Sequence, residues 1–198
     1  MQTQKIDNRL IASEKQINTT LYTQARKNIE IKEHSSRVSQ LCKLLGIAMK
    51  LSDADIFKLE ISGLFHDIGK VYVKAEILNK PGLLTREEWR EIERHPEIGY
   101  FILSKYPGLK GIAKNVLYHH ERYDGSGYPV GLKQEEIPLL SRVIAVVDSY
   151  DAMTNQRPYK ETLDEKTAIL ELIGNKERQF DPIIVDIFIE KVLKADIK

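Results

Sequence analysis

The chain has 198 residues, with hydrophobic residues at 42%, charged residues at 30% and a formal net charge of +1. This length suits one substantial domain, and the near-neutral charge argues against a binder of duplex nucleic acid, because no broad basic face is implied. The single cysteine, Cys42, cannot form an internal disulfide, and no apolar run approaches the ~18 residues that a membrane span requires. These features predict a cytoplasmic globular protein.

Hydrophobic spacing typical of helices begins after a polar N-terminal segment. We expect residues 1–27 to be an extension, either a linker or a helix, and residues 28–198 to form one domain. The first helix is indicated by apolar residues three or four positions apart, namely Val38, Leu41, Leu44, Leu45 and Ala48. Ser52 begins the next helix as its cap, and the Asn79–Gly82 segment is a turn.

Cap and breaker residues divide the remainder of the chain into further helices. Thr85 begins one helix, and Pro96 begins another while biasing His95 toward an extended backbone. Residues 141–154 contain VIAVV, which alone suggests a strand, but no turn signal follows until Asn155, so a helix is favoured. Two more helices begin near Asp164 and at Asp181. The chain is therefore predicted to be all-α.

The five histidines each lie beside a feature that suits a ligand: His34, His66, His95, His119 and His120. Glu30 precedes His34 by four residues, so both face one side of a helix and could hold one metal ion, although a solvated charged face has the same spacing. Another reading of His95 is a simple helix cap. On a helix, the neighbouring His119 and His120 would point about 100° apart, toward two ions or an ion and a substrate.

Carboxylates accompany these histidines at two places in the sequence. Asp67 directly follows His66, and Lys70 places a cation nearby, although an isolated His-Asp pair can also be a surface pair. Asp148 and Asp151 lie three residues apart at the end of an apolar helix, where burial is costly unless they bind a cation, and where the alternative is a helix end exposed to water.

The separate signals together describe one set of imidazoles and carboxylates spread over several helices, which is how metal sites in helical proteins are built. The set contains no group of thiolates, so iron or manganese suits it at least as well as zinc. Sites of this composition commonly hold more than one ion and activate water between them.

The motifs of the chain resemble those of the HD-GYP family, a subgroup of the HD superfamily of metal-dependent phosphohydrolases. In order, the matching segments are LFHDIGK, ILNKPGLLT, RHPEIGYFIL, HHERYDGSGYP, EEIPLLSRVIAVVDSYDAMTNQRPYK and QFDP. The resemblance covers about residues 28 to 193 and departs locally at VYVKAE, which follows HDIGK. It implies a single helical HD-type domain with a metal cluster between core helices and a lip, Gly125–Pro129, over the site.

The resemblance also implies a phosphodiesterase of cyclic di-GMP that holds two or three divalent ions, Fe or Mn, and yields the linear dinucleotide or GMP. Carried over by position, the metal ligands are Glu30, His34, His66, Asp67, His95, His119, His120 and Asp148. Asp67 and Lys70 would be catalytic, with Asp67 bridging two ions. The substrate would contact Lys70, Tyr128, Arg157 and Lys160, and Asp151 would support a ligand from behind.

Other readings of the resemblance stay open. The chain could hydrolyse cyclic GMP-AMP, or it could be a catalytically weak module that binds a cyclic dinucleotide or a protein. A homodimer and a diguanylate cyclase are the candidate protein partners.

Overall fold

The computed structural model describes residues 29–155 and 162–195, so the predicted extension, Arg157 and Lys160 lie outside the described residues. Within these ranges the regular structure is helical, apart from one isolated bridge between Lys176 and Phe180, which confirms the all-α prediction. The α-helices are α2 (Ile29–Ala48), α3 (Asp53–Phe65), α4 (Ala75–Leu78), α5 (Arg86–Ile92), α6 (His95–Ser104), α7 (Lys110–Leu117), α8 (Leu139–Thr154), α9 (Glu165–Gly174) and α10 (Pro182–Ile187). The other helical elements are the 3₁₀-helices η1 (Ile68–Tyr72), η2 (Pro107–Leu109) and η3 (Gln134–Glu136) and the π-helical η4 (Phe188–Leu193).

Polar side chains cap the helices where the sequence predicts their starts. Ser52 accepts a hydrogen bond from a backbone N–H of α3, and Thr85 forms a reciprocal capping box with Glu88 on α5. Asp164 and Asp181 accept backbone N–H groups at the starts of α9 and α10. Each cap satisfies donors that a helix end leaves without an intrahelical partner.

Two hydrophobic clusters form the core, and α3 contributes to both. The first cluster joins α2, α3, α8, α9, α10 and η4, and includes Val38, Leu45, Leu59, Val147, Leu172 and Phe188. The second joins α3, η1, α6 and α7, and includes Ile61, Phe65, Ile68, Leu103 and Val116. α3 therefore joins the two clusters, with Leu59 in the first and Phe65 in the second.

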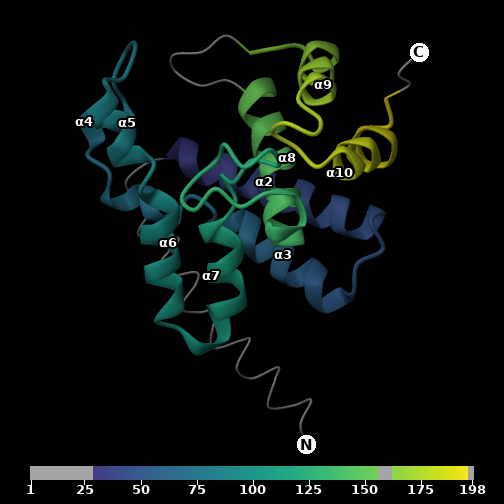
Figure 1. Cartoon of the computed structure of the whole chain (residues 1–198), viewed down its shortest axis with the longest axis horizontal. Coiled ribbons are helices and arrows are strands. Elements are labelled where there is room, and N and C mark those ends of the chain that lie inside the picture. The colour runs from purple at the N-terminus through teal and green to yellow at the C-terminus, as the bar shows by residue number, and fades with distance from the viewer. Residues whose placement is uncertain (1–28, 156–161, 196–198) are drawn as a thin grey trace, which may run out of the picture.

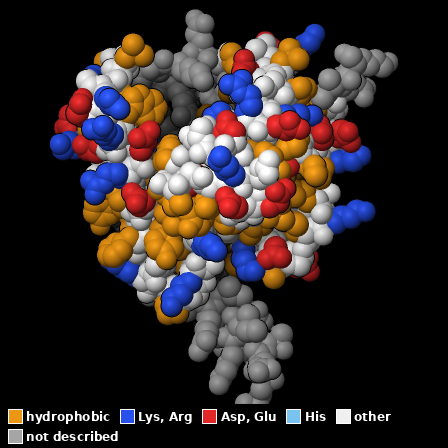
Figure 2. Space-filling view, in the orientation of Figure 1, with side chains coloured by type: hydrophobic (Ala, Val, Ile, Leu, Met, Phe, Trp, Pro, Cys, Tyr) orange, Lys and Arg blue, Asp and Glu red, His pale blue; other side chains and the backbone are white. Residues whose placement is uncertain are grey.

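Figure 1 shows α6 beside α7, and the α4–α5 segment at the opposite end of the molecule from α9 and α10. On the face drawn in Figure 2, Lys and Arg side chains are interspersed with Asp and Glu, in agreement with the near-neutral net charge. Among the described residues, no helix is both long enough and apolar enough to span a membrane.

One local expectation was wrong. His95 is the first helical residue of α6 and not extended, because Arg94 before it is already helical and His95 Nδ1 lies 2.8 Å from the carbonyl oxygen of Ile92. In the last helix, the apolar residues Ile184, Ile187, Phe188 and Val192 pack in the first cluster, and after Ile187 the backbone changes from α10 to the π-helical η4.

Candidate metal centre

The candidate ligands come from five places in the fold, most of them helix ends. His34 lies on α2, His66 ends α3, and Asp67 separates α3 from η1. His95 begins α6, Asp148 lies on α8, and the His119–His120 pair lies in the turn after α7. Because a residue at a helix end can direct its side chain beyond the last turn, side chains from these elements can converge on one interior site.

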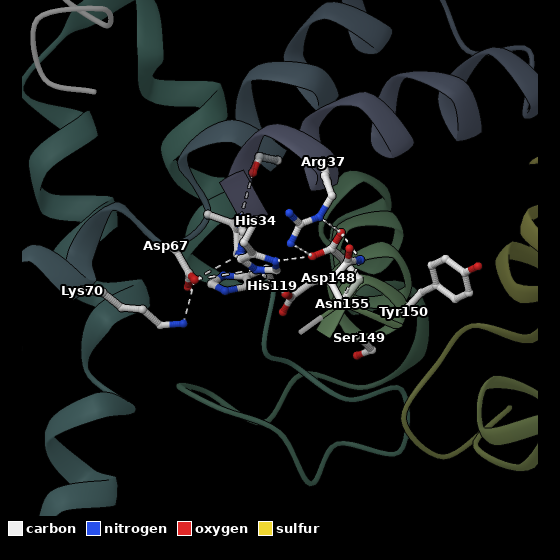
Figure 3. A network of polar contacts seen from close by, with 12 residues as sticks. His34, Arg37, Asp67, Lys70, His119, Asp148, Ser149, Tyr150 and Asn155 are labelled. Carbon is white, nitrogen blue, oxygen red and sulfur yellow. Dashed lines mark hydrogen bonds and ion pairs between the residues drawn. The ribbon is translucent and has the colours of Figure 1, made fainter. Parts of the chain in front are cut away.

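The structure brings seven predicted ligands into two groups. Within each group, the potential ligand atoms, one from each residue, all lie within 4.8 Å of one another. The four-ligand group is Asp67, His95, His119 and His120, and the three-ligand group is His34, His66 and Asp148. His119 and His120 lie in the same group because α7 ends at Leu117, so the pair does not diverge as it would on a helix. Figure 3 shows His34, Asp67, His119 and Asp148 converging between α2 and α8.

Four imidazoles are held by an oxygen acceptor at Nδ1. His66, His95 and His119 each lie three residues after their acceptor, with Nδ1 at 2.8, 2.8 and 2.6 Å from the carbonyl oxygens of Gly63, Ile92 and Val116. His34 Nδ1 lies 2.7 Å from Asp151 Oδ2. Since a carbonyl or carboxylate oxygen only accepts, Nδ1 carries the proton, and in the neutral ring Nε2 keeps its lone pair.

These lone pairs face one another inside the site. The Nε2 atoms of His34 and His66 lie 3.2 Å apart, and those of His95 and His119 lie 3.4 Å apart. Two unprotonated nitrogens at such distances repel unless a cation or a proton lies between them. The residues therefore fit divalent metal ions.

Asp67 is placed between the two groups. Its Oδ1 lies 3.3 Å from His95 Nε2, and its Oδ2 lies 3.4 Å from His66 Nε2. The same Oδ1 atom is buried and receives no well-directed hydrogen bond from the described residues. A buried carboxylate oxygen without a donor is costly, which is a second reason to expect a cation here.

The electrostatics differ between the two groups. Burial lowers the pKa of His120 to about 3, and it lowers the pKa values of His95 and His119 below their ordinary range, so these rings are neutral. Burial alone would raise the pKa of Asp67, but Lys70 and His66 hold it well below the usual value. Neutral imidazoles and an ionised carboxylate are the protonation states that metal ligands require.

In the three-ligand group, carboxylates outweigh the effect of burial. Burial by itself would lower the pKa of His66, but Asp67 and Asp148 raise it to about 10. The pKa of His34 is raised in the same way by Asp148 and Asp151. A proton and a metal ion therefore compete for these two rings.

Two cationic side chains approach the site from opposite sides (Figure 3). Lys70 Nζ donates to Asp67 Oδ2 at 2.7 Å. Arg37 donates through Nε and Nη2 to Asp151 at 2.7 and 3.0 Å, and Asp151 in turn contacts His34. Asp151 is buried rather than exposed to water, so this network supports the predicted role of Asp151 behind a ligand.

The lip covers the site from the side of His120. The ring of Tyr128 lies 4.9 Å from the ring of His120, inclined by 30°, and burial raises the pKa of its hydroxyl. Gly127 permits this approach, because a Cβ atom there would lie 2.3 Å from the backbone nitrogen of Arg122.

Three predicted site residues are not placed by the structure. Glu30 lies on α2 one turn before His34, but its side chain is outside the described residues, as are Arg157 and Lys160 entirely. Sequence reasoning missed two side chains that contact the site or its lip, Arg37 and Glu121. Arg37 follows His34 by one helical turn, and Glu121 directly follows the paired histidines, so spacing offered a weak signal for both.

Known proteins share both the sequence and the fold of the chain. A family model described as "HD domain" matches residues 18–184. A cyclic di-GMP phosphodiesterase of Thermotoga maritima is 38% identical, over 83% of this chain and 45% of the relative. A 3'3'-cGAMP-specific phosphodiesterase of Vibrio cholerae is also 38% identical, over 75% of this chain and 32% of the relative. The chain thus spans less than half the length of these two relatives.

A solved structure of an HDG"Y"P protein from Bdellovibrio bacteriovorus shares the fold, with a TM-score of 0.68, 18% identity, and coverage of 83% of this chain and 53% of that protein. The helical fold and the buried imidazole–carboxylate site define an HD-type metal-binding domain. The chain belongs to the HD domain family, in its HD-GYP subgroup. The predicted boundary after residue 27 stays a prediction, since the family match begins at residue 18.

Proposed function

We propose that this chain is a metal-dependent phosphodiesterase that hydrolyses cyclic di-GMP to the linear dinucleotide and then to GMP. The observation that carries the proposal is the convergence of imidazole Nε2 atoms and ionised carboxylates around Asp67. The activities named for the relatives support the choice of a cyclic dinucleotide as substrate.

Two or three divalent ions, Fe or Mn, would be held by the four-ligand group, by the three-ligand group and by Glu30. Each of the two groups would hold one ion, and Glu30 together with His34 would supply the ligands for a third. When bound, such ions supply Lewis-acid charge and a water molecule activated for attack on phosphorus.

The side chains have separate roles in this proposal. Asp67 joins the two ligand groups and fixes their spacing. Lys70 holds a positive charge 2.7 Å from Asp67 Oδ2, where it can stabilise phosphoryl oxygens and give a proton to the leaving ribose oxygen. Tyr128 offers a ring to a guanine base, while Arg157 and Lys160 are proposed to contact substrate.

Cyclic GMP-AMP is the second candidate substrate, because one of the similar proteins is specific for it. A catalytically weak binding module is less favoured, since seven predicted ligands come together. A homodimer, a diguanylate cyclase partner and a cytoplasmic location remain predictions from the sequence.

The test is turnover by protein purified without oxygen and loaded with ferrous iron or manganese, with cyclic di-GMP and cyclic GMP-AMP compared at equal concentration. We expect metal-dependent release of the linear dinucleotide, then GMP. Asp67→Ala should abolish turnover, while Asp53→Ala, the same change on the exposed start of α3, should leave it intact. Full activity of Asp67→Ala would refute the assignment, and bound metal without turnover of either dinucleotide would favour the binding module.

A further inference from the structure

Glu121 is a buried carboxylate next to the metal centre that the proposed chemistry does not use. It directly follows His120 and is 2% exposed. Its Oε1 accepts hydrogen bonds from the N–H groups of Val130 and Gly131 at 2.8 and 3.1 Å. Its Oε2 accepts from the N–H groups of Gly131 and Leu132 at 3.0 and 3.2 Å.

The backbone is shaped to present these donors together. Gly131 has a φ of 82°, a left-handed conformation that glycine adopts without strain. With this turn, three consecutive N–H groups point at one anion, as in backbone nests that bind anionic ligands. Here the anion is a side chain of the same loop, so the contact closes residues 121–132 into a ring.

The ring contains the lip. The N–H of Tyr128 donates to the carbonyl oxygen of His120, just before the ring begins, at 3.3 Å. At the other edge of the loop, Tyr123 and Asp124 donate backbone N–H groups to the carbonyl oxygens of Gln179 and Arg178 at 3.2 and 2.8 Å. That edge is therefore fixed to the segment between α9 and α10, and Glu121 fixes the edge that follows the lip.

We propose that Glu121 is a positioning residue for substrate binding: its carboxylate holds the 130–132 backbone so that Tyr128 stays over His120. This inference rests on the proposed function, in which Tyr128 contacts the dinucleotide. It assigns Glu121 to the lip and not to the metal ligands, although it is next to one in sequence. Removal of the carboxylate would leave three partly buried N–H groups without their acceptor, and the loop would relax.

The test compares two substrates on the metal-loaded protein. Glu121→Gln keeps the size of the side chain but replaces one acceptor oxygen with an NH₂ donor. We expect the KM for cyclic di-GMP to rise about tenfold, while kcat/KM for bis(p-nitrophenyl) phosphate, which has no nucleobase for Tyr128, stays within about twofold. The metal content per chain should be unchanged.

Two further variants keep the test decisive. Gly131→Ala strains the same contact from the donor side, and it should give the same split between substrates if Glu121→Gln fails to fold. Glu136→Gln is the matched control, because Glu136 is an exposed carboxylate that accepts the N–H of Lys133 at 2.9 Å. It should leave both substrates unaffected.

Hydrogen exchange of the 130–132 amides gives a readout that needs no substrate. These amides should exchange faster in Glu121→Gln and Gly131→Ala than in Glu136→Gln. Equal losses on both substrates together with lost metal would overturn the inference, as would an unchanged KM or unchanged exchange. Failure of the unaltered protein to cleave cyclic di-GMP would count against the proposed function, and hydrogen exchange would still decide the role of Glu121.

Discussion

His34 owes its orientation to Asp151 and, through Asp151, to Arg37. Asp151 accepts from His34 Nδ1, and Arg37 holds Asp151 with two hydrogen bonds. Burial alone would raise the pKa of Asp151, but the hydrogen bonds from His34 and Arg37 keep it below its ordinary value. The ionised Asp151 therefore fixes the His34 tautomer whose Nε2 faces Asp148 at 3.0 Å.

We predict that Arg37→Ala weakens metal binding at the three-ligand group about 10-fold to 100-fold and leaves the four-ligand group unchanged, as is usual for partners behind a ligating histidine. Equilibrium dialysis against defined Mn²⁺ concentrations, followed by elemental analysis, measures this as the loss of one binding step. Lys43→Ala is the control, since Lys43 is an exposed cation on the same helix that pairs with Glu60. Equal weakening of every binding step, or none, would contradict the prediction.

At the scale of elements, η1 and α6 pack backbone to backbone. A Cβ atom on Gly69 would lie 1.9 Å from the carbonyl oxygen of His95 and 2.9 Å from the backbone nitrogen of Gly99. Gly69 follows Asp67 by two residues, so this approach is what brings Asp67 to His95. Packing of two short elements thus fixes the distance between two predicted ligands.

Gly69→Ala should therefore lower the free energy of unfolding by about 3 kcal/mol, because backbone atoms cannot yield as a flexible side chain can. Urea denaturation of the metal-free protein measures this change. Gly111→Ala, on α7 with open space around it, should instead raise stability by up to about 1 kcal/mol through helix propensity. A Gly69→Ala protein as stable as the unaltered one would show that the two elements separate easily.

Contacts between residues far apart in the chain could not be predicted from the sequence, because they depend on how the helices pack. The convergence of neighbouring ligands was predictable for two pairs, His66 with Asp67 and His119 with His120. Adjacent residues in one motif need only one local turn to reach the same site. The Arg37–Asp151 contact joins residues 114 positions apart, and no local pattern reports it. The helical backbone of His95 was missed for a related reason, since the hydrogen bond from its ring to Ile92 outweighs the local preference that Pro96 imposes.

At the scale of the whole molecule, the site lies where elements of both hydrophobic clusters meet, so its charges bear on global stability. Facing Nε2 pairs and the buried Asp67 Oδ1 raise the free energy of the folded chain unless cations offset them. An ion that binds only the folded state at 100 times its Kd adds about 2.7 kcal/mol of stability.

We therefore predict that removal of metal by a chelator lowers Tm by about 5–10 °C, which is the shift expected for a chain of this size. Thermal unfolding would be followed by circular dichroism, with and without restored Mn²⁺ or Fe²⁺. Asp67→Ala serves as the control, because loss of the central carboxylate should reduce the metal-dependent part of Tm while the helices remain. If Tm changes neither when metal is removed nor when it is restored, the ligand groups are held in place by packing alone.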